Sequence, residues 1–341
     1  MRLRKLLITL GLALAALMMM PLGGHANPEF VMNFGTVAPD GTPWADQLRD
    51  VKKRIETESG GRIKVKLFLG GSLGSEIEMV QDVARGERLQ GGGFSTGAIG
   101  EALDIPILLL PELPYLFRDN AEADAVLDEV LYTPVAASLA AKGFMLGAWA
   151  ENGWRCFATK GGPATSPAEL AKYKMRSQES PVHLDMYKAL SVQAVAKPTS
   201  EVLPALNTGI VDGFDNTPLF SLAAGWIEPV THYTLSRHIY QPAGVIYSKK
   251  FHDSLPPDLQ KVLMGDPAAE AVRGRVGVRS LEAELLETIQ AMGKEVVPLT
   301  DEQRKSFRQL TRPVHKQFLA AHPDVVDAYT QVKAKLKSMR Q

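Results

Sequence analysis

The chain reads FVMNFG at residues 30–35 and RIKVKLFL at residues 62–69, and these two apolar-rich runs decide the fold. The first run predicts a strand, and the second begins with alternating apolar and polar side chains, as half-buried strands do. Between them, Thr42-Pro43 supplies a helix cap and a proline at the first helical position, and Gly60-Gly61 ends the helix. Another helix is expected from about Ser75 to Gly86. This order of elements predicts an α/β fold with a parallel or mixed sheet and helices on both faces.

The second half of the chain carries similar signals. Helices are expected to begin after Ser166-Pro167, Ser180-Pro181 and Thr300. Residues 295–299 predict the last clear strand, at a sheet edge because Pro298 lacks a backbone N–H. Residues 267–292 predict one long helix of about 40 Å, at about 1.5 Å per residue, which would lie across two small domains.

The N-terminus is typical of a secretory signal peptide. Met1-Arg2-Leu3-Arg4-Lys5 is basic, residues 6–20 carry no charge, and Gly24-His25-Ala26 offers small residues for cleavage. The uncharged run is shorter than the roughly 20 residues that span a bilayer, although an uncleaved anchor remains the alternative. We therefore expect an exported, periplasmic chain that is cleaved near Ala26.

Composition narrows the class of protein. The chain has 38 basic and 38 acidic residues, and the signal carries three basic ones, so the mature chain would have a net charge of −3. Such a balance does not indicate nucleic-acid binding, which needs a concentrated basic face. Cys156 is the only cysteine, so no intramolecular disulfide is possible. The length of about 315 mature residues favours two domains.

Arg176 is the first candidate binding residue. It lies at the end of the predicted strand KMRS (residues 174–177), just before the helix start at Ser180-Pro181. A guanidinium is permanently charged and can donate two parallel hydrogen bonds to one carboxylate. Two interpretations follow from this local pattern, a carboxylate-binding site and an internal salt bridge.

One enzyme-like motif is present. Residues 93–97, GFSTG, match the G-x-S-x-G nucleophile elbow, and Ser95 could form a triad with Asp215 and His238. The motif follows residues 88–92, RLQGG, which do not resemble a buried apolar strand. A secreted serine esterase is therefore the weaker interpretation.

No cofactor or metal site is predicted. The glycine-rich runs lack the lysine of a phosphate loop and the full dinucleotide fingerprint, and the histidines are scattered. Asp212 and Asp215 could share a cation, but a turn after a strand explains them equally well. Binding without catalysis is the class that these observations favour.

Several segments, in order, resemble one family: GGRIKV (60–65), GSLGSE (71–76), LPYLF (113–117), GWR (153–155), KMR (174–176), ALNTGIVDG (205–213) and LPPDLQ (255–260). On these residues the chain is similar to the periplasmic solute-binding proteins of TRAP transporters, of the DctP (dicarboxylate-binding) type.

The resemblance implies a two-lobed periplasmic-binding-protein fold with mixed sheets, hinge strands and a long helix spanning both lobes. It implies lobe I over residues 27–152 and about 241–280, lobe II over 153–240 and about 281–325, and a C-terminal helix over 326–341. It further implies capture of a small organic acid and its delivery to the membrane permease of a TRAP transporter. A ligand-sensing accessory protein of a signalling system is an alternative with the same fold.

The resemblance also implies roles for individual residues. Arg176 matches the family's carboxylate-binding arginine, Arg155 a second arginine aimed at the ligand, and Asn216 a ligand-contacting asparagine. The other expected ligand-binding residues are near the hinge, in the loop of the first lobe, beside Asn216, or in a possible apolar wall: His238, Phe94, Ser95, Thr96, Asp215, Trp44 and Trp226. Because that loop lacks charged residues, a monocarboxylate or moderately apolar acid is expected in preference to a highly hydroxylated sugar acid.

Overall fold

The computed structural model describes residues 27–341. The predicted signal peptide lies outside these described residues. Within residues 27–341, no helix is both long enough and apolar enough to cross a membrane.

One nine-stranded mixed sheet runs through both lobes, with the order β2-β1-β3-β8-β4-β7-β5-β6 and β9 paired to β8. In the first lobe, β1 (Phe30–Thr36) pairs in parallel with β2 (Ile63–Phe68) and β3 (Gly91–Ser95). In the second lobe, β5 (Lys174–Ser177) pairs in parallel with β6 (Gln193–Ala196) and β7 (Gly213–Asn216). The predicted α/β class with a mixed sheet is confirmed.

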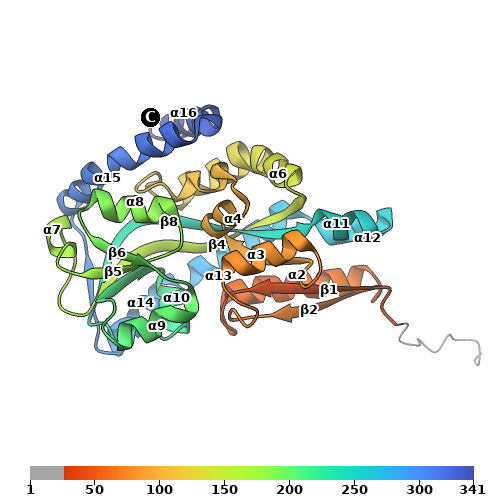
Figure 1. The fold of residues 1–341 in the computed structure, drawn as a ribbon, viewed down its shortest axis with the longest axis horizontal. Coiled ribbons are helices and arrows are strands. Elements are labelled where there is room, and N and C mark those ends of the chain that lie inside the picture. The colour runs from red at the N-terminus through yellow and green to blue at the C-terminus, as the bar shows by residue number, and fades with distance from the viewer. Residues whose placement is uncertain (1–26) are drawn as a thin grey trace, which may run out of the picture.

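Two long strands join the lobes. β4 (Phe144–Thr159) and β8 (His232–Ser248) form an antiparallel pair that crosses the molecule horizontally in Figure 1. Their register shifts at three places, the middle one between Glu151 and Gly153. Such irregularities bend a strand pair, and here they lie where the chain passes from one lobe to the other.

The helices of the first lobe begin at the capping signals of the sequence. Thr42 accepts a hydrogen bond from the N–H of Ala45 at the start of α2, and Ser75 and Glu78 form a capping box on α3. The lobe contains α2 (Pro43–Glu58), α3 (Glu76–Arg85), α4 (Thr96–Leu103), α5 (Asn120–Val126), α6 (Tyr132–Ala141), α11 (Lys249–Ser254) and α12 (Pro257–Met264). Three short turns of helix, η1 (Pro106–Leu108), η2 (Leu110–Glu112) and η3 (Leu127–Leu131), complete it.

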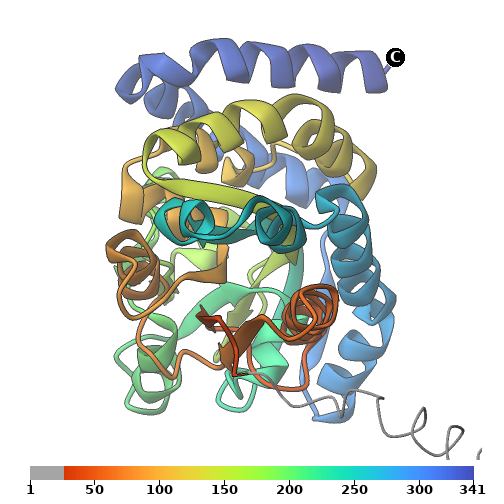
Figure 2. The same ribbon diagram turned by 90° about the vertical axis from the view of Figure 1, so that its right-hand side faces the viewer.

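The second lobe contains α7 (Pro167–Leu170), α8 (Pro181–Ala189), α9 (Thr199–Asn207), α10 (Pro218–Ala223), β9 (Glu295–Pro298) and α15 (Asp301–Ala321). Phe307 of α15 is buried in the core of this lobe. After η4 (Pro323–Val325), α16 (Val326–Met339) returns to the first lobe and packs against α5 and η3. Figure 2 shows α16 lying across the top of the molecule.

The predicted long helix over residues 267–292 is two helices in the structure. α13 (Pro267–Ser280) packs on α2 and β4, and α14 (Glu282–Ala291) packs on α10 and β9, with a break at Leu281. Gly274 does not break the helix. A Cβ there would lie 2.3 Å from Oε1 of Gln47, so the glycine allows α13 to approach α2 closely.

Candidate functional site

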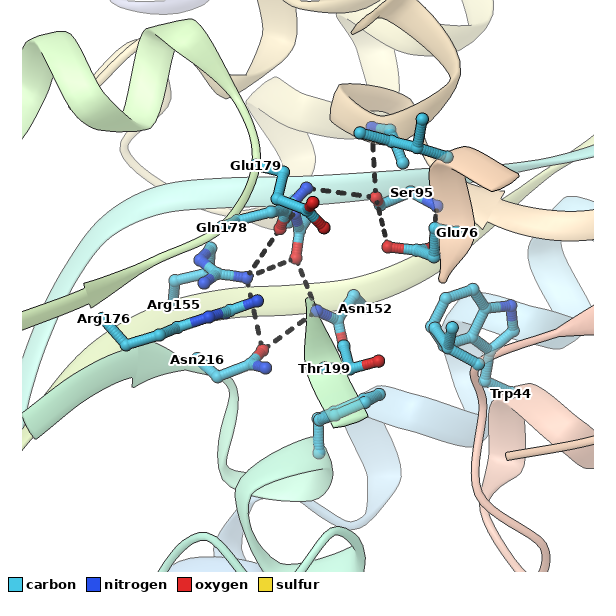
Figure 3. Close-up of a pocket in the computed structure, with 15 residues that line it drawn as sticks. Trp44, Glu76, Ser95, Asn152, Arg155, Arg176, Gln178, Glu179, Thr199 and Asn216 are labelled. Carbon is cyan, nitrogen blue, oxygen red and sulfur yellow. Dashed lines mark hydrogen bonds between the residues drawn. The ribbon is translucent and has the colours of Figure 1, made fainter. Parts of the chain in front are cut away.

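A pocket lies between the lobes, beside the crossing strands, and encloses about 480 Å³ including its mouth. Its first-lobe side includes Trp44, Glu76 and Ser95. Its second-lobe side and the crossing strands contribute the remaining polar groups, which are Asn152, Arg155, Arg176, Gln178, Glu179, Thr199, Asn216 and Gln241. Figure 3 shows Arg176 entering the pocket opposite Glu76 and Trp44.

Arg176 projects from β5 into this pocket and is 2% exposed. Its Nε and Nη2 both donate to the backbone carbonyl of Lys197, at 2.9 and 2.6 Å, which fixes the orientation of the guanidinium. Its charged plane lies 5.1 Å from the centroid of the Trp226 ring. Within residues 27–341 it forms no ion pair with a carboxylate, and burial together with the nearby Arg155 lowers the pKa of Arg176 to about 10. The pocket therefore holds a buried cation whose charge is uncompensated.

Arg155, on β4, is a buried arginine of a different kind. Its Nε donates to Oδ2 of Asp215 at 2.6 Å, and its Nη1 donates to Oε1 of Gln241 at 2.7 Å. Burial alone would lower the pKa of Arg155, but the Asp215 carboxylate, together with the nearby Glu112 and Tyr187, raises it above its ordinary value. Because this charge is paired, Arg155 supports the pocket wall through a fixed network.

Side-chain amides surround Arg155 and form one hydrogen-bond network with it. Asn152 donates to Oε1 of Gln241 at 2.6 Å and to Oδ1 of Asn216 at 3.2 Å. Gln241 in turn donates to Oε1 of Gln178 at 2.6 Å. These mutual hydrogen bonds place amide groups along the pocket wall at defined positions, where hydroxyl groups of a ligand could pair with them.

Glu76 lies at the start of α3 on the first-lobe side of the pocket. Its carboxylate accepts hydrogen bonds from the backbone N–H of Ser95 at 2.8 Å and from the Ser95 hydroxyl at 3.0 Å. Burial raises the pKa of Glu76 to about 7, against the opposing effect of these two hydrogen bonds. The pocket therefore has a cation on one side and a titrating carboxyl group on the other.

The lobes touch each other across the pocket. Gln178, in the second lobe, donates to the hydroxyl of Ser95 at 3.2 Å. Deeper in, Nε2 of His183 on α8 lies 2.7 Å from Oε2 of Glu112. Glu112 also accepts hydrogen bonds from the hydroxyl of Thr96 and the N–H of Gly97, so it joins both lobes.

Five of the ten residues expected at the site lie on the pocket wall: Arg176, Arg155, Asn216, Ser95 and Trp44. The other five lie behind it. Asp215 pairs with Arg155, and His238 stacks on Phe157 with ring centroids 4.0 Å apart. Thr96 bonds Glu112, Trp226 lies behind Arg176, and Phe94 is buried in the core.

The position of Ser95 partly resembles a nucleophile elbow, because it is the last residue of β3 and caps α4. Contrary to the prediction from residues 88–92, a buried strand does lead to Ser95. Its hydroxyl, however, bonds Glu76 and Gln178. His238 instead contacts Ser236 and Asp215, so the described chain contains no Ser95–His238 hydrogen bond.

A two-lobed α/β fold with a polar pocket between lobes that are joined by crossing strands defines an extracellular solute-binding protein. The comparisons agree. Residues 34–322 match the bacterial extracellular solute-binding proteins of family 7, the DctP family, and the chain belongs to that family.

The chain is 33% identical over 266 residues to a solute-binding protein of Verminephrobacter eiseniae, covering 78% of each chain. It is 28% identical over 274 residues to the 2,3-diketo-L-gulonate-binding periplasmic protein of Escherichia coli, covering 80% of this chain and 82% of the relative. Its fold is similar to a TRAP periplasmic solute-binding protein of Roseobacter denitrificans with bound β-D-glucuronate. That similarity has a TM-score of 0.84 and 26% identity, and it covers 89% of this chain and 99% of the other.

Proposed function

We propose that this chain is the periplasmic solute-binding subunit of a TRAP transporter and that it captures a small monocarboxylic acid bearing hydroxyl groups. The observation that carries the proposal is Arg176, a buried and oriented guanidinium without a carboxylate partner in residues 27–341. A ligand carboxylate would accept hydrogen bonds from Nη1 and from the remaining hydrogen of Nη2.

Two features support a single carboxylate on the ligand. Asp215 already neutralises Arg155, so Arg176 supplies the unpaired charge in the wall. Glu76 lies on the other side of the pocket, where an ionised carboxylate would repel a second carboxylate of a dicarboxylic acid. The anion is therefore expected to bind with its charged end at Arg176.

The rest of the wall supports hydroxyl groups on the ligand. Glu76, Asn152, Gln178 and Gln241 present carboxylate and amide groups, and Phe94 and Trp226 are not on the wall. Trp44, the third aromatic residue expected in an apolar wall, does line the pocket, together with Val37, Ile77, Ala98 and Phe220, so apolar side chains lie beside these polar groups. The relatives named for 2,3-diketo-L-gulonate and glucuronate also bind acids with one carboxylate and several oxygen groups.

Lobe closure follows from the same contacts. Arg176 and Gln178 belong to the second lobe, whereas Glu76 and Ser95 belong to the first, so a ligand that bridges them favours the closed arrangement. The closed protein then delivers the acid to the membrane permease. Export through the signal peptide, with cleavage near Ala26, places it in the periplasm, where the named relative from Escherichia coli also functions.

A thermal-shift screen tests this proposal. The mature chain is heated with aldonic and uronic acids, with C4-dicarboxylates and with the corresponding neutral sugars. We expect a concentration-dependent rise in Tm with at least one hydroxylated monocarboxylate and no rise with its neutral sugar. A rise with dicarboxylates alone would contradict the role assigned to Glu76, and no rise with any acid would contradict the function.

A further inference from the structure

A second concave site lies away from the ligand pocket, between α15, α16 and the segment from Pro114 to Arg118. This basic groove encloses about 2020 Å³ including its open mouth and shares no lining residue with the pocket. Nine lysine and arginine residues line it, against one acidic residue, Asp301. A charge balance of this kind distinguishes the groove from a surface where both signs are mixed.

Most of these cations are not neutralised within the protein. Arg237 pairs with Glu282, Arg340 pairs with Glu122, and Arg304 donates to the carbonyl of Ser236. The side chains of the remaining six form neither an ion pair nor a hydrogen bond with any residue of 27–341: Arg118, Lys305, Arg308, Arg312, Lys316 and Lys333. Burial, Arg340 and Arg312 lower the pKa of Lys333, as expected in a positive local potential.

The spacing along α15 gives the groove a regular pattern. Arg304, Arg308, Arg312 and Lys316 follow at every fourth residue, so they lie on one face of the helix at intervals of about 6 Å. Like charges four residues apart on one helix face repel each other and destabilise the helix. A row of carboxylates at the same interval would remove this repulsion.

The groove also has aromatic walls. Tyr115, Phe117 and Tyr329 line it, and the hydroxyl of Tyr115 is buried without a hydrogen-bond partner in the described chain. The backbone of Tyr115 has a left-handed φ of 54°, and its N–H donates to the carbonyl of His238 at 2.7 Å. Phe117 is only 4% exposed, so Tyr115 and Tyr329, which are partly exposed, are the rings that can pack against the carbon atoms of a bound chain.

We propose that this basic groove is a docking site for an acidic segment of a partner protein, with carboxylates spaced like the cations of α15. Its concave form, with walls from three segments, fits a polypeptide better than a flat bilayer, which would contact only the rim. The carboxylates would pair with Arg308, Arg312 and Lys316, and aliphatic portions of the segment would contact the aromatic walls.

The test uses the mature chain and a fluorescent helical peptide with glutamate at every fourth position, together with a peptide in which glutamine replaces each glutamate. Fluorescence anisotropy measures binding at low and at physiological salt. The groove variant is Arg308→Glu/Arg312→Glu, at two exposed positions. The matched control, Lys53→Glu/Lys66→Glu, makes the same change of charge at two exposed positions of the first lobe.

We expect the glutamate peptide to bind, the glutamine peptide not to bind, and the groove variant to bind at least about tenfold more weakly than the control variant. Equal weakening in both variants would show nonspecific attraction and overturn the proposal. Absence of peptide binding, or saturable binding to phosphatidylglycerol vesicles in its place, would overturn it too. The groove variant should show the same thermal shift with the organic acid as the wild type. This comparison distinguishes a defect of the groove from a defect of the ligand pocket.

Discussion

The substitution Glu76→Gln provides a sharp test of the electrostatics of the pocket. Burial raises the pKa of Glu76 to about 7 from an ordinary value of 4.5. The folded protein therefore binds a proton at Glu76 more tightly than the unfolded chain does. As the pH rises from about 4.5 through 7, ionisation of Glu76 therefore lowers the free energy of unfolding. This loss of stability is complete above pH 7.

The size of the effect follows from the shift. A change of roughly 2.5 pKa units corresponds to about 3 kcal/mol. Glu76 is half-buried and faces the pocket, where water retains part of its solvation, so we expect about 1–2 kcal/mol. In a chain of this length that corresponds to a rise in Tm of about 1.5–3 °C for the glutamine variant at pH 8.

The assay is thermal unfolding of the ligand-free protein between pH 5 and pH 8. Glu76→Gln should match the wild type near pH 5 and exceed its Tm at pH 8. Glu87→Gln, at an exposed position next to the end of α3, is the control and should follow the wild type throughout. If Glu76→Gln were less stable than the wild type at pH 8, that result would refute the conclusion that burial of the ionised Glu76 carboxylate destabilises the fold.

Three further predictions concern stability and reactivity. Asp215→Asn leaves the buried charge of Arg155 unpaired, so the free energy of unfolding measured in urea should fall by about 3–5 kcal/mol. A fall of less than about 1 kcal/mol would contradict the pairing. Gly274→Ala should cost about 1–3 kcal/mol and Gly277→Ala clearly less, since a Cβ at Gly277 would lie 3.3 Å from its nearest neighbour; equal losses would contradict the close helix approach. Burial raises the pKa of Cys156 to about 11, so a thiol reagent at pH 8 should label it only after denaturation, and rapid labelling of the folded protein would count against its burial.

Local signals predicted most element boundaries because caps and turns depend on neighbouring residues. Thr42, Ser75, Ser166 and Thr300 all cap helices as their sequence patterns indicate. The central strand β3 was not predicted because GGG is a poor strand former. Its glycines are required by packing, since a Cβ at Gly92 would lie 2.3 Å from the Phe94 ring.

The site was only partly predictable, for a reason that concerns strand geometry. Neighbouring residues of a strand point to opposite faces, so Phe94 must point away from the pocket that Ser95 lines. Asn152 and Gln241 reach the pocket through the register of β4 and β8, which no local pattern specifies. Glu76 looked like an ordinary acidic residue in the first turn of a helix, and its position in the pocket depends on how α3 packs against β3 and α4.

The central claim is that Arg176 binds the carboxylate of the ligand. Isothermal titration calorimetry measures it directly, with the acid that gives the largest thermal shift and with the variants Arg176→Ala and Arg176→Lys. Arg273→Ala, at an exposed position on α13, is the control. Loss of a buried charge pair costs about 3–5 kcal/mol, so we predict affinity at least about a hundredfold weaker in Arg176→Ala. We also predict weak binding by Arg176→Lys, which lacks the guanidinium fork. Affinity in Arg176→Ala equal to that of the control would contradict the account.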